Sequence, residues 1–221
     1  MKAMILAAGH GSRMRPLTNH TPKPLLKVGG KPLIVWHIEK LKNAGFQDIV
    51  INIAWLGDQI PDSLGDGSKF GLNIHYSDEQ NEGALETAGG IVKALPLLGN
   101  MPFLVINGDI WCDYPLTNQN PIAGDRLAHL ILVNNPSHNP DGDFSLNDNV
   151  LKSEGSVKYT FSGIGYYHPK LFQDLPQGKR PLAPLLHKKM AISQITGEIF
   201  SGDWRDIGTP ERLAKLDRDL N

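Results

Sequence analysis

Residues 2–16 read KAMILAAGHGSRMRP, and this stretch decides the fold. Its first part, Lys2–Ala7, is a short and nearly continuous apolar run, which predicts a strand buried on both faces. The chain then enters a long irregular segment, Ala8–Pro24, that contains two glycines and three prolines. A buried strand that opens directly into such a loop indicates the parallel sheet of an α/β protein.

The segments that follow support a parallel sheet. Leu33–Ala44 has a helical spacing of apolar residues, with Pro32 at its start and Gly45 just past its end. Asp48–Ile53 is a second apolar run, so the order is strand, loop, helix, strand. This order requires a crossover connection and therefore a parallel pair of strands. The other elements predicted in the first half are a strand over Asn73–Tyr76, a helix over Glu86–Leu98 and a buried strand over Phe103–Ile106.

The second half has a different pattern. A strand is predicted over Leu127–Val133, and several short strand candidates lie near 144–167 among Asn- and Pro-rich turns. Helices are predicted over Leu182–Met190 and Thr209–Leu220, the latter with a threonine N-cap followed by proline. We therefore predict a single three-layer α/β domain, with a mostly parallel mixed sheet and a small mixed insertion in the second half.

The composition is that of an ordinary globular protein, because 40% of the 221 residues are hydrophobic and 20% are charged. Cys112 is the only cysteine, which excludes an internal disulfide and favours a reducing, cytoplasmic setting. The apolar run at the N-terminus is too short for a signal peptide, and no stretch approaches the roughly 18 apolar residues of a membrane span. We therefore expect a soluble cytoplasmic protein with no membrane partner.

The charge of the chain is unevenly distributed. Its net charge of −1 argues against a general nucleic-acid binder. Residues 1–42 nevertheless contain eight Lys or Arg and one acid, Glu39, which gives +7 there and leaves −8 for the remainder. A basic segment on an acidic body suits a small polyanion held at one site, and a solvated basic face is an equal alternative.

The glycine loop, Ala8–Met14, has the composition of a phosphate-binding loop. Small residues directly after a strand allow backbone N–H groups to converge on phosphate oxygens, and Gly9 and Gly11 permit the close approach. Arg13 adds a guanidinium fork for phosphate. The loop is not a dinucleotide fingerprint, because Met14 stands at the third glycine position, and it is not a Walker loop, because no G-K-[ST] occurs.

Lys23 stands between two prolines in the sequence. Pro22 and Pro24 fix their own φ angles and bias the residues before them toward extended conformations. This restriction would hold Lys23 in one orientation near the glycine loop. The alternative is a rigid surface turn with an incidental lysine.

Two aspartates are candidates for a Mg²⁺ site. Asp109 ends the buried strand region over Phe103–Ile106, and Asp206 lies just before the C-terminal helix. Mg²⁺ prefers oxygen and is usually held by one or two carboxylates together with substrate phosphates. Taken alone, Asp109 could equally be a turn former and Asp206 a partner of Arg205. The histidines show no metal-ligand spacing, and Cys112 has no adjacent base that would mark a nucleophile.

The chain resembles the sugar nucleotidyltransferases in the motif LAAGxGSRM at residues 6–14 and in Pro22-Lys23-Pro24-Leu25. Later segments with counterparts in that family are Glu86–Gly89, Asn107–Asp109 and Phe161–Ile164. The resemblance implies a Rossmann-like nucleotidyltransferase fold. It also implies that residues of about 1–110 mainly bind the nucleotide and residues of about 111–221 mainly bind the sugar.

The resemblance implies roles for individual residues. Arg13 and Lys23 would be catalytic, and Asp109 and Asp206 would be the ligands of Mg²⁺. The residues implied for nucleotide binding are Ala8, Gly9, Gly11, Ser12, Arg13, Lys23, Glu86 and Thr87.

Four residues are candidates for the sugar. Gly163 resembles the family glycine that lies beneath the sugar, with a simple bulge as the alternative. Asn107 is placed to form a hydrogen bond with the sugar, with an Asn-Gly turn as an equal alternative. Asp143 and Glu154 could accept hydrogen bonds from sugar hydroxyls, although Asp143 could instead form a turn at a strand edge.

The resemblance implies Mg²⁺-dependent transfer of a nucleoside monophosphate from an NTP to a sugar 1-phosphate, with release of pyrophosphate. Trp55-Leu56-Gly57, the Leu85-Glu86-Thr87 segment and a chain that ends without a left-handed β-helix resemble one group of the family. That group uses UTP and N-acetylmuramic acid 1-phosphate in cell-wall recycling. Members that use GTP and mannose 1-phosphate are the alternative. An inactive nucleotide-sugar-binding regulatory subunit is a further alternative, which the presence of Lys23, Asp109 and Asp206 opposes.

Overall fold

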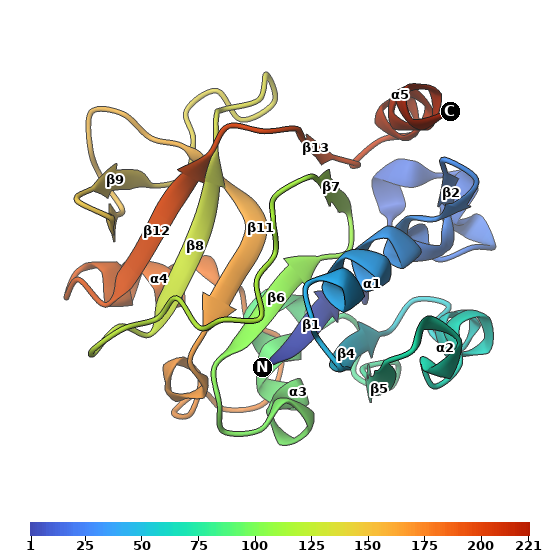
Figure 1. Cartoon of the computed structure of the whole chain (residues 1–221), viewed down its shortest axis with the longest axis horizontal. Coiled ribbons are helices and arrows are strands. Elements are labelled where there is room, and N and C mark those ends of the chain that lie inside the picture. The colour runs from blue at the N-terminus through green and yellow to red at the C-terminus, as the bar shows by residue number, and fades with distance from the viewer.

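The centre of the molecule is a nine-stranded sheet with the strand order β5-β4-β1-β6-β11-β8-β12-β10-β9 (Figure 1). The computed structural model describes all residues, 1–221. The strands of this sheet are β1 (Lys2–Leu6), β4 (Asp48–Ile53), β5 (Asn73–Asp78), β6 (Phe103–Asn107), β8 (Ala128–Val133), β9 (Ser145–Asn147), β10 (Val150–Lys152), β11 (Thr160–Tyr167) and β12 (Ile195–Phe200).

Two short antiparallel pairs and five α-helices complete the fold. The pairs are β2 (Lys27–Val28) with β3 (Lys31–Pro32), and β7 (Ile110–Cys112) with β13 (Trp204–Asp206). The α-helices are α1 (Leu33–Asn43), α2 (Gln59–Leu64), α3 (Glu86–Leu98), α4 (Ala183–Met190) and α5 (Pro210–Leu220).

The large sheet is mixed, with most strands pointing one way. Strands β5, β4, β1 and β6 are mutually parallel, and β12 is parallel to β8. Strand β11 runs antiparallel to both β6 and β8, and β10 runs antiparallel to both β12 and β9. Only β11 and β10 therefore oppose the other strands, which confirms the predicted mostly parallel mixed sheet.

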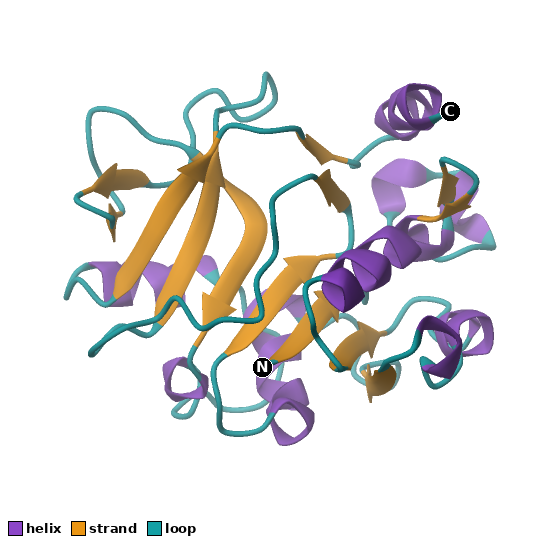
Figure 2. Cartoon of the chain, viewed as in Figure 1, coloured by secondary structure: helices purple, strands orange, loops and turns teal.

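Helices cover both faces of the sheet, which confirms the three layers (Figure 2). Alternate residues of β1 point to opposite faces, as the pleat of a strand requires. Ala3 and Ile5 pack in one core with residues of α1 and α2, whereas Met4 packs in a second core with residues of α3 and α4. The second-half strands β8, β11 and β12 extend the same sheet and share these two cores.

A smaller third core joins the two ends of the chain. Leu213 and Leu216 of α5 pack with Met14 of the glycine loop and Val28 of β2. Helix α5 begins as predicted, because the Thr209 hydroxyl accepts a hydrogen bond from the backbone N–H of Arg212 at 3.4 Å. The C-terminal segment is thereby fixed beside the glycine loop.

Most predicted elements are confirmed, but several short ones were missed, among them the strand pairs β2–β3 and β7–β13. The strand over Asp48–Ile53 and the helix over Glu86–Leu98 have the predicted bounds. Strand β12 was missed because glycine and glutamate interrupt its apolar pattern. Its Gly197 is needed because the neighbouring strand β8 passes close by: an added Cβ would lie 2.6 Å from the Leu130 carbonyl oxygen. The short helix α2 was also missed.

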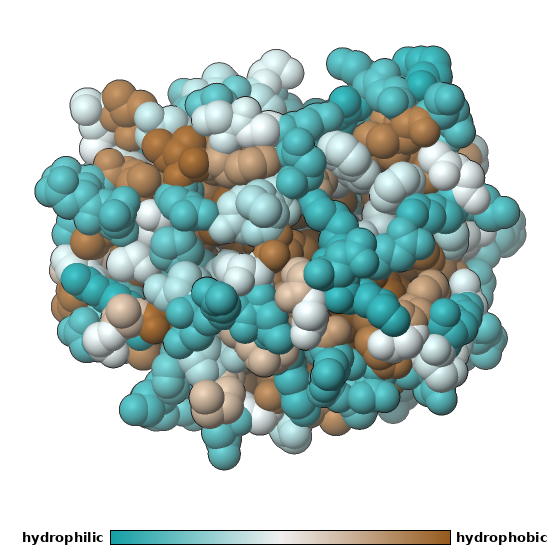
Figure 3. All heavy atoms as spheres, in the orientation of Figure 1, coloured by the Kyte–Doolittle hydropathy of each residue, from teal (hydrophilic) through white to brown (hydrophobic).

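The surface carries no extended apolar patch on the face shown in Figure 3, where hydrophobic areas are separated by hydrophilic ones. None of the helices is both long enough and apolar enough to cross a membrane.

Candidate active site

A cavity of about 440 Å³ opens at the carboxyl ends of β1, β4 and β6. Ligands of parallel α/β sheets bind at this edge. The predicted site residues that line the cavity are Ala8, Gly9, Gly11, Ser12, Arg13, Lys23, Glu86, Thr87, Asn107 and Asp109. The fold therefore brings predicted residues from four separate stretches of the sequence to one place.

In the glycine loop, Gly11 has the conformation that only glycine adopts readily, whereas Gly9 has an ordinary φ and open space around it. Gly11 has a φ of 61° and precedes the short 3-10 helix Ser12–Met14. An added Cβ at Gly11 would lie 2.9 Å from Cγ2 of Thr18, so only glycine fits there. Thr18 is fully buried, and its hydroxyl donates a hydrogen bond of 2.8 Å to the Gly11 carbonyl. Thr18 thus holds the loop, a role that sequence reasoning missed.

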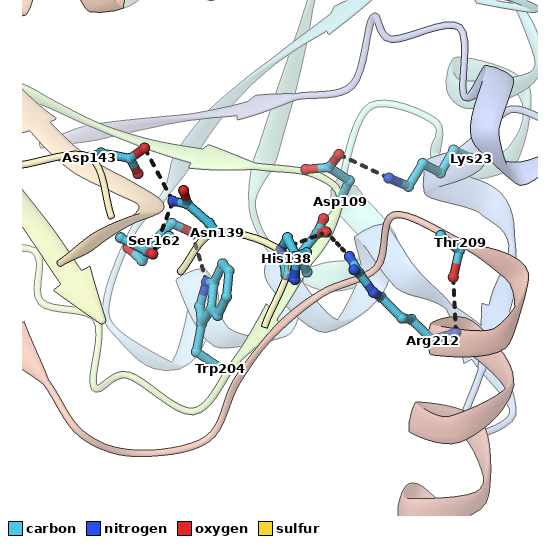
Figure 4. A network of polar contacts seen from close by, with 11 residues as sticks. Lys23, Asp109, His138, Asn139, Asp143, Ser162, Trp204, Thr209 and Arg212 are labelled. Carbon is cyan, nitrogen blue, oxygen red and sulfur yellow. Dashed lines mark hydrogen bonds and ion pairs between the residues drawn. The ribbon is translucent and has the colours of Figure 1, made fainter. Parts of the chain in front are cut away.

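Lys23 lies beside the glycine loop, as its two prolines predict. Pro22 is extended, with a ψ of 142°, and Lys23 begins the 3-10 helix Lys23–Leu25. An added Cβ at Gly11 would be 3.3 Å from Cβ of Lys23, which shows how closely the two segments approach. The Lys23 side chain is almost buried, and its Nζ is 2.9 Å from Oδ2 of Asp109 (Figure 4).

Asp109 and Asp206 are neighbours, although they are 97 positions apart in the sequence. Strands β7 and β13 pair antiparallel, and the backbone N–H of Ile207 donates to the carbonyl of Asp109 at 2.8 Å. Asp109 lines the cavity and directly precedes β7, whereas Asp206 ends β13 and does not line the cavity. Two neighbouring carboxylates offer the oxygen donors that suit a hard cation completed by phosphate oxygens. The donor set therefore fits the predicted Mg²⁺.

The partners of Asp206 differ from the alternative considered from the sequence. Asp206 forms an ion pair with Arg212, and Nε2 of His138 lies 3.4 Å from its carboxylate (Figure 4). Arg205 instead pairs with Asp203 and Asp219. His138 and Arg212 were missed because one comes from a loop and the other from α5, and only the fold brings them together.

Helix α3 begins at a strained residue in the cavity wall. Glu86 has a φ of 61°, which is unusual for a residue with a side chain, and its carboxylate lies 3.6 Å from Nζ of Lys179. The segment around Arg180 secures this start: the N–H of Arg180 donates to the carbonyl of Leu85 at 2.9 Å, and the N–H of Ala88 donates to the carbonyl of Arg180 at 3.1 Å.

Two buried polar residues in the cavity wall were also missed. Asn52 interrupts the apolar run of β4 just before Ile53 and is 3% exposed, and Glu79 follows β5 and is fully buried. Burial raises the pKa of the Glu79 carboxyl above its ordinary value, and hydrogen bonds from Leu85 and Asn52 oppose that rise. The sequence signal for a buried polar contact was Asn52, the single polar residue in the otherwise apolar run Ile49–Ile53.

Of the four candidate sugar residues, only Asn107 lines the cavity. Gly163 has a φ of 83° at a bulge in β11, and an added Cβ there would lie 2.7 Å from Nδ2 of Asn107. Gly163 therefore occupies a bulge and also makes room for the Asn107 side chain, which lines the cavity. The bulge is therefore confirmed for Gly163, and its position beneath the sugar stays a prediction.

Asp143 and Glu154 do not line the cavity. The Asp143 carboxylate accepts a hydrogen bond of 2.8 Å from the N–H of Phe161 and one of 3.2 Å from Nδ2 of Asn139 (Figure 4). The Glu154 side chain is 89% exposed, with Oε2 at 3.0 Å from Nζ of Lys158. The structure thus holds Asp143 in a turn against β11 and leaves Glu154 at the surface.

Comparisons with known proteins agree with this geometry. The nucleotidyl transferase family model matches residues 2–144. Over 223 aligned residues the chain is 55% identical to an N-acetylmuramate α-1-phosphate uridylyltransferase of Neisseria meningitidis serogroup B, with 97% of this chain and 96% of that protein covered. A protein of the same name from Caulobacter vibrioides is 33% identical, with 97% and 93% covered.

The fold is also similar to solved structures. One is a Bacillus anthracis protein described as a glucose-1-phosphate thymidylyltransferase, with a TM-score of 0.84 and 26% identity. The match covers 100% of this chain and 95% of that one. The similarity therefore extends to both halves of the chain.

Proposed function

This chain belongs to the nucleotidyl transferase family, and we propose that it transfers UMP from UTP to N-acetylmuramic acid 1-phosphate. The products would be the UDP-sugar and pyrophosphate. The observation that carries the proposal is the convergence of the glycine loop, Lys23 and Asp109 on one cavity at the ends of parallel strands. The two N-acetylmuramate uridylyltransferases, which match nearly the whole chain, support the choice of substrates.

The reaction needs charge stabilisation and alignment more than it needs a base. A sugar phosphate is largely ionised at pH 7, because its second pKa is about 6. Its oxygen can therefore attack the α-phosphorus of UTP directly, in line with the departing pyrophosphate. The barrier comes from repulsion between two anions and from charge that accumulates on pyrophosphate.

The positive groups of the cavity address both problems. Arg13 and Lys23 would bind the triphosphate and stabilise the developing charge. Asp109 and Asp206 would hold Mg²⁺, which neutralises charge on the phosphates when bound. In the structure Lys23 contacts Asp109, so phosphate oxygens would replace Asp109 as the partner of Lys23 when UTP enters.

The sugar side is proposed from fewer contacts. Asn107 lines the cavity at the end of β6, with Gly163 directly against it, so the sugar would lie over this pair. Asp143 is the acid proposed to accept hydrogen bonds from sugar hydroxyls, since a carboxylate has more acceptor sites than its two protein partners use. The product would return N-acetylmuramic acid to cell-wall synthesis.

The test is an assay of four NTPs against a panel of sugar 1-phosphates, with pyrophosphate release as the readout. UTP with N-acetylmuramic acid 1-phosphate should give the highest kcat/KM. N-acetylglucosamine 1-phosphate, which lacks the lactyl group, should react less well. A higher value with GTP and mannose 1-phosphate would assign the chain to the guanylyl-transferring group, and no turnover with any pair would indicate a binding subunit.

A further inference from the structure

Two buried polar side chains connect the loops on either side of the nucleotide cavity. The backbone N–H of Ala7, at the start of the glycine loop, donates to Oδ1 of Asn52 at 2.8 Å. Nδ2 of Asn52 donates to Oε1 of Glu79 at 2.7 Å. Oε2 of Glu79 accepts from the backbone N–H of Leu85 at 2.9 Å, just before Glu86 and Thr87 of the cavity wall.

The direction of these three hydrogen bonds determines which side chains can connect Ala7 to Leu85. Both ends are backbone N–H groups, which can only donate. Asn52 accepts at one end and donates at the other, so the next group must accept from Asn52 and also from Leu85. An ionised carboxylate accepts at both oxygens, whereas a glutamine in its place would present N–H₂ to one of two donors.

The neighbouring helix leaves space for the pair. Gly90 lies inside α3, and an added Cβ there would be 2.8 Å from Oε1 of Glu79 and 2.9 Å from Nδ2 of Asn52. Glycine weakens a helix interior, so its presence reflects this close approach. Both Asn52 and Glu79 also line the cavity itself.

We propose that Asn52 and Glu79 are a positioning pair that fixes the glycine loop and the Leu85–Thr87 segment at one separation, so that the nucleotide subsite is formed before UTP binds. The inference rests on the proposed function only for the identity of the nucleotide. Neither residue takes part in transfer; they act through the two segments that they connect. Preorganisation of this kind lowers the ordering that binding requires.

The test is calorimetric binding of UTP with magnesium chloride to four proteins: the wild type, Asn52→Asp, Glu79→Gln and the double variant. In Glu79→Gln the new side-chain N–H₂ faces one of its two donors, the N–H₂ of Asn52 or the N–H of Leu85. In Asn52→Asp the new carboxylate faces the Glu79 carboxylate, with no hydrogen between them. Each single variant should raise the Kd for UTP about 10-fold, the scale of one lost hydrogen bond to a charged group.

The double variant reverses the direction of the central hydrogen bond and restores every donor to an acceptor. The new carboxylate at position 52 accepts from Ala7 and from the new amide at position 79, whose oxygen accepts from Leu85. Its Kd for UTP should return to within about twofold of the wild type, since the two sites are directly coupled. This rescue also answers the objection that a single variant merely misfolds.

A separate control removes a hydrogen bond far from the cavity. Thr196→Val deletes a hydroxyl that donates to the Ala128 carbonyl at 3.2 Å and lies 3.0 Å from Nδ1 of His129, both on β8, and it should change the melting temperature at most. In kinetic assays the single variants should raise the KM for UTP and leave the KM for the sugar phosphate unchanged.

Two results would count against these ideas, and they are distinguishable. Single variants that bind UTP as tightly as the wild type, or a double variant no better than the single variants, would overturn the positioning pair. A wild-type chain that binds no NTP would instead contradict the proposed function. If another NTP binds more tightly than UTP, the proposed base is wrong, and the four proteins are compared with that NTP.

Discussion

The first half of the chain carries its candidate residues on loops that directly follow parallel strands, whereas the second half carries them on turns, a bulge and a short edge pair. The glycine loop follows β1, Asn52 lies near the carboxyl end of β4, and Asp109 follows β6, so neighbouring strands bring them to one cavity. In the second half, Asp143 is held against β11 and Asp206 against β7.

This difference shows how the fold brings the candidate residues of each half together. Parallel strands end at one edge, so residues that follow them converge without further contacts. Turn and edge residues converge only where long-range pairing places them. We therefore expect substitutions in the first half to reduce turnover strongly, and substitutions in the second half, apart from those of the proposed metal ligand Asp206, to affect mainly the sugar.

Lys23→Ala should have the largest effect. Loss of this charge-stabilising group should lower kcat/KM by about 10²–10³-fold, because the charge on pyrophosphate is no longer neutralised. Pyrophosphate release measures the effect, and the melting temperature should stay near that of the wild type. Lys27→Ala, which removes an exposed lysine on β2, is the matched control. Near-normal turnover of Lys23→Ala would remove Lys23 from the catalytic role.

Asp109→Asn and Asp206→Asn connect the two halves, because one residue comes from each. Each should weaken Mg²⁺ dependence and lower kcat/KM by about 10²-fold, the scale of a lost charge-stabilising contact. The double variant should be no worse than the more damaging single variant, since the two residues act as one unit.

Asp203→Asn is the control for this pair, since Asp203 precedes β13 and its carboxylate pairs with Arg205. Fully additive losses in the double variant would argue against a shared metal site. Activity that persists in the presence of a chelator would argue against a metal altogether.

Asp143→Ala should have the smallest effect on activity and test the second half alone. Loss of a charge-assisted hydrogen bond to a sugar hydroxyl should raise the KM for the sugar phosphate about 10-fold and leave the KM for UTP unchanged. The melting temperature should also fall, because the N–H of Phe161 loses its acceptor. Both KM values and the melting temperature are measured on this variant.

Asp143→Asn separates the proposed sugar contact from the role in the turn, because its amide oxygen can still accept a hydrogen bond from the N–H of Phe161. A fall in melting temperature with both KM values unchanged in Asp143→Ala would make Asp143 a turn residue only. Glu154→Gln, measured in the same assay, compares the second acidic candidate. A larger rise in KM there would transfer the sugar contact from Asp143 to Glu154.

The same difference explains what the sequence could predict. The glycine loop and the prolines around Lys23 are local patterns, and local sterics determine their conformations, so both were predictable. Asn52 and Glu79 are 27 residues apart (79 − 52), and His138 and Arg212 meet only at Asp206. Contacts of this kind depend on strand order, which a single sequence does not show.

The central claim is that the cavity directs a sugar phosphate onto the α-phosphorus of UTP. The most direct measurement follows the label when UTP carries ³²P at the α position and N-acetylmuramic acid 1-phosphate is the acceptor. All of the transferred label should appear in the UDP-sugar, and unlabelled pyrophosphate should be released in equal amount. Label in pyrophosphate or inorganic phosphate, or no labelled UDP-sugar, would contradict the claim.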